Sequence, residues 1–494
     1  MTKNKSSNFG LSKTKYTMKL KLLLFFFIVA IYTDAVAQTG YRIEGQIKGL
    51  SGGNCFLANY YATQIYAKDT AQADANGRFV FEGSKPLSQG IYEIVLPDRK
   101  TLLRVLITED QDFSFSADTT DIIGKTKVTG SRDNEIFYEF QQFMKKTEDE
   151  YQQLKAQKIP ETNQRFKDLQ DKRKTFYDNF MKQNDGTFTV KLFKASADPE
   201  IPPAPKQANG KIDSAWVFNY YKSHFWDNFD FSDARMLMTP FLHQKLDRYI
   251  KDLTVQVEDS LVKEADFVVS KAINGKQKDI IAYTIWFITN QYETPKTVGT
   301  DGVFVHMAEK YYLTGIMPVS DSSTLQNVKE RVKVLKPLLV NKIIPDLGVM
   351  SYRAPDRLDY IHGSKAEYEV VFFYSPTCGH CPESAPKLKA FHDKFKPQGV
   401  EVMTIAIDGS EEEWRKFIKE FKLENLVNTY GMVASRQVVY RNDYDVFSTP
   451  TVYVLDKNKK IIARRLGVED LEPFLNVYKK RLAMERKPST ASRQ

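Results

Sequence analysis

The stretch VVFFYSPTCGHCPESAP, residues 370–386, decides how the C-terminal part of the chain folds. Its first residues form a continuous apolar run, which is typical of a buried strand, and a helical pattern begins at Cys381. Two of the three cysteines of the 494-residue chain, Cys378 and Cys381, therefore lie where a strand passes into a helix. Three chemistries use two cysteines at this spacing: a metal site, a haem attachment and a redox-active dithiol.

The sequence disfavours the first two of these chemistries. Covalent haem attachment needs a histidine directly after the second cysteine, but Pro382 stands there. A structural zinc ion needs further ligands, and Cys55 is far away in the sequence. An inert structural disulfide is a minor alternative, because so short a loop closes little chain entropy. We therefore predict no metal and no cofactor.

The dithiol hypothesis explains why the pair should react. Cys378 is predicted at a helix N-terminus, where free backbone N–H groups and the helix dipole stabilise a thiolate. A cationic His380 would add to this stabilisation. Cys381, further into the helix, would be the shielded thiol that resolves a mixed disulfide.

The pattern resembles the thioredoxin superfamily, and most of all the secreted TlpA/ResA-type thiol-disulfide oxidoreductases. The resemblance rests on the strand before the CGHC sequence, on Pro386 and on the sequence FSTPTVYVLDKNKKII, residues 447–462. It implies that Pro386 kinks the active-site helix and that Pro450 is a cis-proline packed against the cysteines. It also implies that Thr449 pairs its backbone with an extended substrate.

The chain departs from the family pattern at three positions. Thr377 stands where the family usually has tryptophan, and Phe372 occupies the position of thioredoxin's buried acid. A base for Cys381 must then lie elsewhere, and Glu383 is the nearest candidate, although a solvent-facing glutamate is the commoner case. The central Gly-His resembles protein disulfide isomerases, so the direction of electron flow stays open.

The remaining sequence predicts a multidomain chain. Short runs of alternating polar and apolar residues favour an all-β sandwich over residues 38–130, and helical periodicity follows over residues 131–347. An α/β thioredoxin-like fold is expected over residues 348–485, with a flexible tail at 486–494. Within that fold we predict strands at 367–374, 400–407, 451–455 and 460–466, and helices at 381–395, 411–421 and 470–481.

Residues 1–37 have the pattern of a secretory signal peptide: lysines, a short apolar run and the small residues Ala35-Val36-Ala37. We therefore predict export, to the periplasm of a Gram-negative envelope, with no stable membrane span after cleavage. These residues carry six lysines and one aspartate, which leaves about +4 of the net charge of +9 for the rest. A charge this small and interspersed does not imply nucleic-acid binding.

The leading hypothesis is a periplasmic oxidoreductase that reduces, oxidises or isomerises protein disulfides, with protein thiols and a redox partner protein as partners. A binding or scaffold protein whose redox module serves one partner is the alternative from another class. A thiol-dependent peroxidase is a further alternative, but Pro376, Thr377 and Cys378 are contiguous, unlike the spaced peroxiredoxin motif. Cys55 is expected to be a buried apolar residue.

Overall fold

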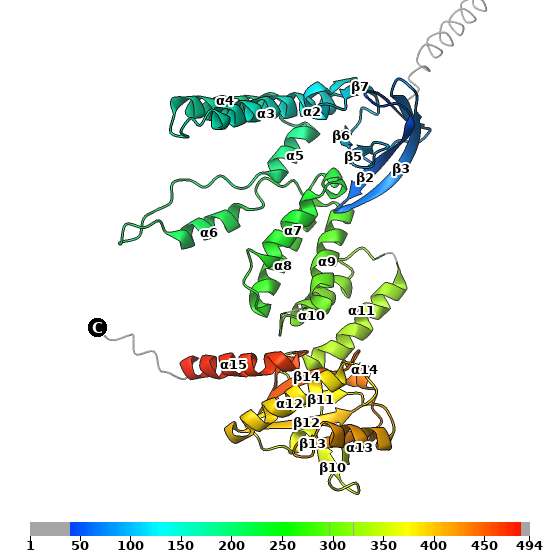
Figure 1. The fold of residues 1–494 in the computed structure, drawn as a ribbon, viewed down its shortest axis with the longest axis vertical. Helices are drawn as coiled ribbons and strands as arrows, with labels where there is room; N and C mark the ends of the chain where they lie inside the picture. The colour runs from blue at the N-terminus through cyan, green and yellow to red at the C-terminus, as the bar shows by residue number, and fades with distance from the viewer. Residues whose placement is uncertain (1–39, 296, 320, 486–494) are drawn as a thin grey trace, which may run out of the picture. The chain divides into compact units, whose positions relative to one another are not determined.

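The computed structural model describes residues 40–295, 297–319 and 321–485 (Figure 1). The predicted signal peptide at 1–37 and the predicted tail at 486–494 lie outside the described residues. The described chain forms two compact units. The first contains the residues up to Asp198 together with Arg235–Phe241, and the second contains the others.

Two four-stranded sheets open the first unit. Their eight strands are β1 (Tyr41–Lys48), β2 (Gly53–Tyr61), β3 (Gln64–Ala73), β4 (Arg78–Gly83), β5 (Gly90–Val95), β6 (Leu102–Ile107), β7 (Asp112–Asp118) and β8 (Lys127–Thr129). One sheet has the order β4-β1-β7-β8 and the other β3-β2-β5-β6. The predicted β-rich N-terminal region is therefore confirmed.

The sequence prediction omitted strand β3. Most of its residues are exposed, with burial confined to positions near its end, so no apolar alternation marks it. Its pairing with β2 along the whole of both strands holds it in the sheet instead. Tertiary pairing overrides weak local preference here.

Helices complete the first unit. They are α2 (Ile122–Lys125), α3 (Arg132–Ala156), α4 (Gln164–Gln183) and α5 (Phe188–Ser196), followed by the 3-10 turn Ala234–Met238. Helices α3, α4 and α5 share a core of Ile136, Phe180 and Val190. Aromatic pairs extend this core, for example Phe143 stacked on Phe176 with ring centroids 3.6 Å apart.

Helices also form the first part of the second unit. They are α6 (Ser214–His224), α7 (Phe241–Lys251), α8 (Glu258–Gly275), α9 (Lys278–Glu293), α10 (Gly302–Met307), which continues as a π-helical turn, and α11 (Ser322–Leu335). The predicted central helical region is confirmed. No helix among the described residues is both long and apolar enough to cross a membrane.

A seven-stranded sheet forms the C-terminal part of the second unit. Its strands are β9 (Gly348–Ser351), β10 (Leu358–Tyr360), β11 (Tyr368–Tyr374), β12 (Val400–Ala406), β13 (Val427–Ala434), β14 (Thr451–Asp456) and β15 (Ile461–Arg464), in the order β10-β9-β13-β12-β11-β14-β15. The helices are α12 (Cys381–Phe395), α13 (Glu411–Glu420), α14 (Tyr440–Asp443) and α15 (Leu471–Glu485). The predicted α/β order is confirmed, but strands β9, β10 and β13 were not foreseen. They are short or interrupted by polar residues and glycine.

The two faces of this sheet carry separate cores. Alternate residues of β11, such as Phe372 and Tyr374, join Cys381 in one core, while Val371 and Phe373 join the other. Because neighbouring strand residues point to opposite faces, the dithiol lies on the Phe372 face. Helices α12, α13 and α15 supply the other side of that core.

Candidate active site

The end of strand β11 and the start of helix α12 position the two cysteines. Helix α12 begins at Cys381, with His380 at its N-cap and Pro382 in its first turn. Backbone bonds close the turn: the Cys378 N–H donates to the Ser375 carbonyl at 3.2 Å, and the Cys381 N–H to the Cys378 carbonyl at 3.3 Å. Both cysteines are free thiols at the N-terminal end of the helix.

The two thiols differ sharply in environment. Cys381 is fully buried, whereas Cys378 is partly exposed. Burial raises the pKa of the Cys381 thiol to about 12. Partial burial also raises the pKa of Cys378, but the Thr449 side chain and the N–H groups of His380 and Cys381 more than offset it, so its pKa is lowered. Cys378 is therefore the thiol that ionises first.

The loop before strand β14 brings Thr449 and Pro450 to the nucleophile. The Thr449–Pro450 peptide bond is cis. The Cys378 thiol donates to the Thr449 carbonyl with a sulfur–oxygen distance of 3.3 Å, across 71 residues of sequence. An incoming disulfide at Cys378 would therefore meet the backbone of this loop.

The other predicted site residues lie on helix α12. Pro386 is inside the helix, and the His380 side chain is exposed. The contribution of His380 to the Cys378 pKa comes through its backbone N–H group. Glu383 is exposed in the first turn of the helix.

A buried acid is present in strand β11, but it lies away from the dithiol. Glu369 is 1% exposed and pairs with Lys459, whose Nζ is 2.5 Å from the carboxylate. Burial raises the pKa of Glu369 to about 7. Alternate residues of a strand point to the same face, so Glu369 lies on the face of Val371 and Phe373. This face is opposite to that of Cys381.

Buried polar groups on the dithiol's own face were not foreseen from the sequence. The Tyr374 hydroxyl and the Trp414 indole N–H are both buried and form no hydrogen bond of normal geometry among the described residues, but the Thr404 and Trp414 side chains lie close enough to the hydroxyl to offset part of the rise that burial causes in the pKa of Tyr374. Burial raises the pKa of Tyr374, and a charge on Cys381 raises it further, which places the hydroxyl within electrostatic reach of that thiol. The alternation of residues in β11 would have indicated that Tyr374 shares the face of Phe372.

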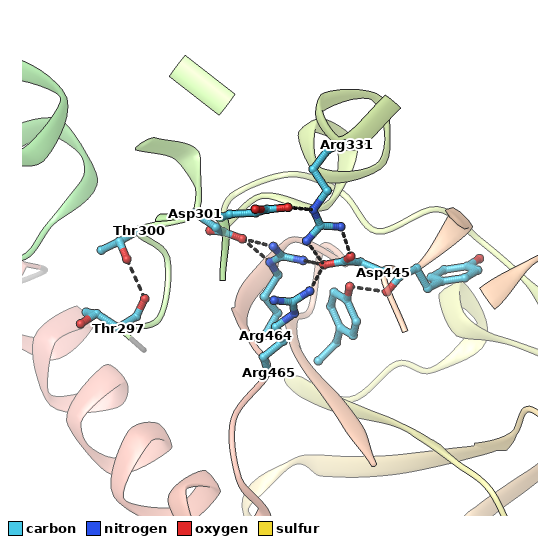
Figure 2. Close-up of polar contacts among 10 residues, drawn as sticks. Thr297, Thr300, Asp301, Arg331, Asp445, Arg464 and Arg465 are labelled. Atoms are coloured by element: carbon cyan, nitrogen blue, oxygen red, sulfur yellow. Dashed lines mark hydrogen bonds and ion pairs between the residues drawn. The ribbon is translucent and has the colours of Figure 1, made fainter. Parts of the chain in front are cut away.

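The loop between α14 and β14, residues 444–450, is called the Pro450 loop below. A buried ion network fixes its start (Figure 2). The Asp445 carboxylate is completely buried and accepts from three arginines: Arg331 of α11, Arg464 at 2.8 Å and Arg465 at 2.5 Å. Arg464 also contacts Asp301, and both of these side chains are almost fully buried. The partners of Asp445 thus come from the helical region, from the last residue of strand β15 and from the residue that follows it.

Comparison with known proteins agrees with this geometry. Residues 366–461 match the family model described as thioredoxin-like. Residues 41–137 and 141–336 match two families described as domains of unknown function, DUF4369 and DUF5106.

The similar proteins are thiol-disulfide oxidoreductases. The thiol-disulfide oxidoreductase ResA of Geobacillus kaustophilus is 30% identical over 110 residues, 22% of this chain and 60% of that protein. The ResA of Geobacillus thermodenitrificans is 29% identical over the same shares. The chain thus spans 60% of the length of these curated relatives.

Solved structures of similar proteins are also known. A domain of a possible thiol-disulfide isomerase from Cytophaga hutchinsonii is 36% identical, with a TM-score of 0.28 over 30% of this chain and 98% of that one. A thioredoxin-like protein from Bacteroides caccae is 19% identical, with a TM-score of 0.44 over 57% of this chain and 98% of that one.

Proposed function

We propose that this chain, whose C-terminal domain belongs to the thioredoxin-like family, catalyses thiol-disulfide exchange on protein substrates. The observation that carries the proposal is the asymmetry of the dithiol. Cys378 is accessible with a lowered pKa, while Cys381 is buried with its pKa raised to about 12. Cys378 is suited to attack a client disulfide, and Cys381 is suited to resolve the mixed disulfide that results.

The reaction proceeds in two exchanges. The Cys378 thiolate attacks one sulfur of a client disulfide, the client S–S bond breaks, and the second client sulfur leaves as a thiolate that takes up a proton. Cys381 then loses its proton and attacks Cys378, which releases the first client sulfur. The client disulfide has gained two electrons and two protons, and the enzyme now holds a Cys378–Cys381 disulfide. The reverse sequence oxidises a client dithiol.

The surroundings of the cysteines support both steps. Thr449 accepts from the Cys378 thiol, so a mixed disulfide would form directly beside the Thr449–Pro450 backbone. Cys381 lies one helical turn from Cys378 and is shielded from solvent, so it meets only a disulfide already formed at Cys378. Cys55 is fully buried, and burial raises its pKa to about 11, so it does not compete.

The proposed location is outside the cytoplasm, in the periplasm of a Gram-negative cell. The support is the lysine-rich, apolar and small-residue pattern of residues 1–37. In that compartment, client proteins contain disulfides that need exchange, and a redox partner protein must restore the dithiol or the disulfide after each cycle.

The test is the redox equilibrium of the Cys378/Cys381 pair in glutathione buffers, read by thiol alkylation. Cys378→Ser is the control, because it removes the nucleophile and leaves Cys381 and Cys55 in place. A potential near about −270 mV identifies a reductase, and one of about −180 to −120 mV an isomerase or oxidant. The proposal fails if no reversible disulfide forms between the two cysteines at any glutathione ratio.

A further inference from the structure

A groove of about 1130 Å³ lies beside the Pro450 loop, within the second unit. Ser448 and Pro450 line it from the loop, and Asn327 and Arg331 line it from helix α11. Thr449, between Ser448 and Pro450, is the residue that contacts the nucleophile. A client that reaches Cys378 along this loop therefore passes through the groove, and part of its wall comes from the helical region.

An exposed aromatic ring stands in this groove between two cations. Phe447 is 51% exposed, so its ring is accessible to a ligand in the groove. The Arg331 guanidinium lies 4.9 Å from its ring centroid and the Arg441 guanidinium 4.4 Å. Such a ring offers apolar contact, and the guanidinium groups beside it offer donors to a carboxylate.

Among the described residues, one cation that lines the groove has no carboxylate partner. Arg331 and Arg465 bind Asp445, and Arg331 is also 3.6 Å from Glu293. Arg436 pairs with Asp443 and Lys333 with Glu330. Arg441 is exposed, and its contact among the described residues is the Phe447 ring. An acidic side chain entering the groove would supply the missing counter-ion.

The Asp445 ion network holds two walls of this groove together. Asp445 lies two residues before Phe447, and three arginines hold its fully buried carboxylate. One of the three, Arg331, also stacks on Phe447 (Figure 2 shows Arg331 above Asp445). Helix α11 and the Pro450 loop are therefore tied together at the point where the aromatic ring is presented.

We propose that this groove binds an extended, acidic segment of the client protein next to the cysteine that reacts with Cys378. The proposal rests on the thiol-disulfide exchange proposed above and names its substrate class. Arg441 binds a client carboxylate, the Phe447 ring packs against the client chain, and helix α11 forms the outer wall. Selection of clients is then a shared property of the helical region and the redox domain.

The test uses the full chain and a matched pair of short peptides. Each peptide carries one cysteine as a mixed disulfide with 2-mercaptoethanol, and the two differ only in glutamate or glutamine residues flanking the cysteine. The rate of thiol release by the reduced protein is measured at low and at high salt. Bis(2-hydroxyethyl) disulfide is the small neutral substrate, which has no carboxylate for Arg441 to bind.

We expect the glutamate peptide to react about three- to fivefold faster than the glutamine peptide at low salt, as for a partly exposed ion pair, with less difference at high salt. Arg441→Gln should remove this preference, and Arg441→Lys should keep most of it. The matched control is Arg481→Gln, on the exposed face of α15, which should keep all of it. Arg481→Gln should also react with the neutral disulfide at the rate of the unmodified protein.

Three results would overturn the proposal. Equal rates for both peptides, or a preference for the glutamate peptide that persists in Arg441→Gln, would show that Arg441 does not select acidic clients. The proposed thiol-disulfide exchange would be unaffected. Failure of the unmodified protein to react with bis(2-hydroxyethyl) disulfide would overturn the proposed function itself, and the client site with it.

Discussion

Replacing Asp445 with asparagine should destabilise the second unit more than any other single charge removal near the Pro450 loop. The carboxylate is fully buried and binds Arg331, Arg464 and Arg465, whose side chains are 11%, 3% and 28% exposed. Breaking a buried ion pair by removing one partner costs about 3–5 kcal/mol, because a buried charge is left uncompensated. Arg464 keeps Asp301 and Arg331 keeps Glu293, so we expect the lower end, about 3 kcal/mol.

Tryptophan fluorescence can isolate this effect. All four tryptophans, at positions 216, 226, 286 and 414, lie in the second unit, so urea unfolding followed by their emission reports on that unit. A loss of about 3 kcal/mol should lower the urea midpoint by about 1 M or more. Asp443→Asn is the matched control: it breaks the exposed pair with Arg436 and should cost less than about 1 kcal/mol.

A second substitution tests the physical reason. Arg465 loses its carboxylate partner in Asp445→Asn, so adding Arg465→Met should recover part of the lost stability by removing the stranded charge. The reasoning is refuted if Asp445→Asn and Asp443→Asn shift the midpoint equally. It is also refuted if the free-energy costs of Asp445→Asn and of Arg465→Met simply add in the double variant, because the two side chains would then act independently.

Three further results are expected from the site. In Cys381→Ser, the alkylation rate of Cys378 should rise with pH to a midpoint below the ordinary value of about 8.5, and a midpoint at or above it would contradict the lowered pKa. Tyr374→Phe should slow resolution of a mixed disulfide by about tenfold, because the forming Cys381 thiolate loses a buried hydroxyl within electrostatic reach, while the pH midpoint of Cys378 stays unchanged; an unchanged resolution rate would show that Tyr374 takes no part in the reaction. Burial raises the pKa of Glu369 from 4.5 to about 7, so between these pH values the folded state holds a proton that the unfolded state has released. The free energy of unfolding therefore falls as pH rises from 4.5 to 7. Unfolding in urea at several pH values should show this fall relative to Glu369→Gln, and parallel pH curves for the two proteins would disprove it.

The sequence predicted the elements that carry strong local signals. Strand β11 and helix α12 were expected at 367–374 and 381–395, and they are observed at Tyr368–Tyr374 and Cys381–Phe395. A continuous apolar run followed by a helical period is sufficient to place both. Strand β13 has no such signal, because Asn428, Thr429 and Gly431 interrupt its apolar residues, and only pairing with β12 and β9 defines it.

The environment of the dithiol was predictable in part. The CGHC spacing predicted that Cys378 and Cys381 lie together between a strand and a helix, and strand alternation could have indicated that Tyr374 shares the face of Cys381. The Asp445 network has no local signature, because Arg331 and Asp445 are 114 residues apart and Asp301 and Arg464 are 163 residues apart. Single-sequence patterns report periodicity over a few turns of helix or residues of strand, and a charge pair at such a separation leaves no trace in them.

The position of this network changes how the domains of the chain should be understood. One family match ends at residue 336 and the next begins at residue 366, which suggests two separate modules. Yet Asp301 and Arg331 belong to the first of these segments, and their partners Arg464 and Asp445 belong to the second or lie beside its end. Leaving a nearly fully buried arginine without its aspartate is energetically costly. A substitution of one of these residues in either segment therefore requires a matching change of its partner in the other segment. Since Arg331 also forms part of the groove, any change that preserves this pairing preserves the outer wall of the proposed client site. Stability of the second unit and the proposed selection of clients thus depend on the same side chains.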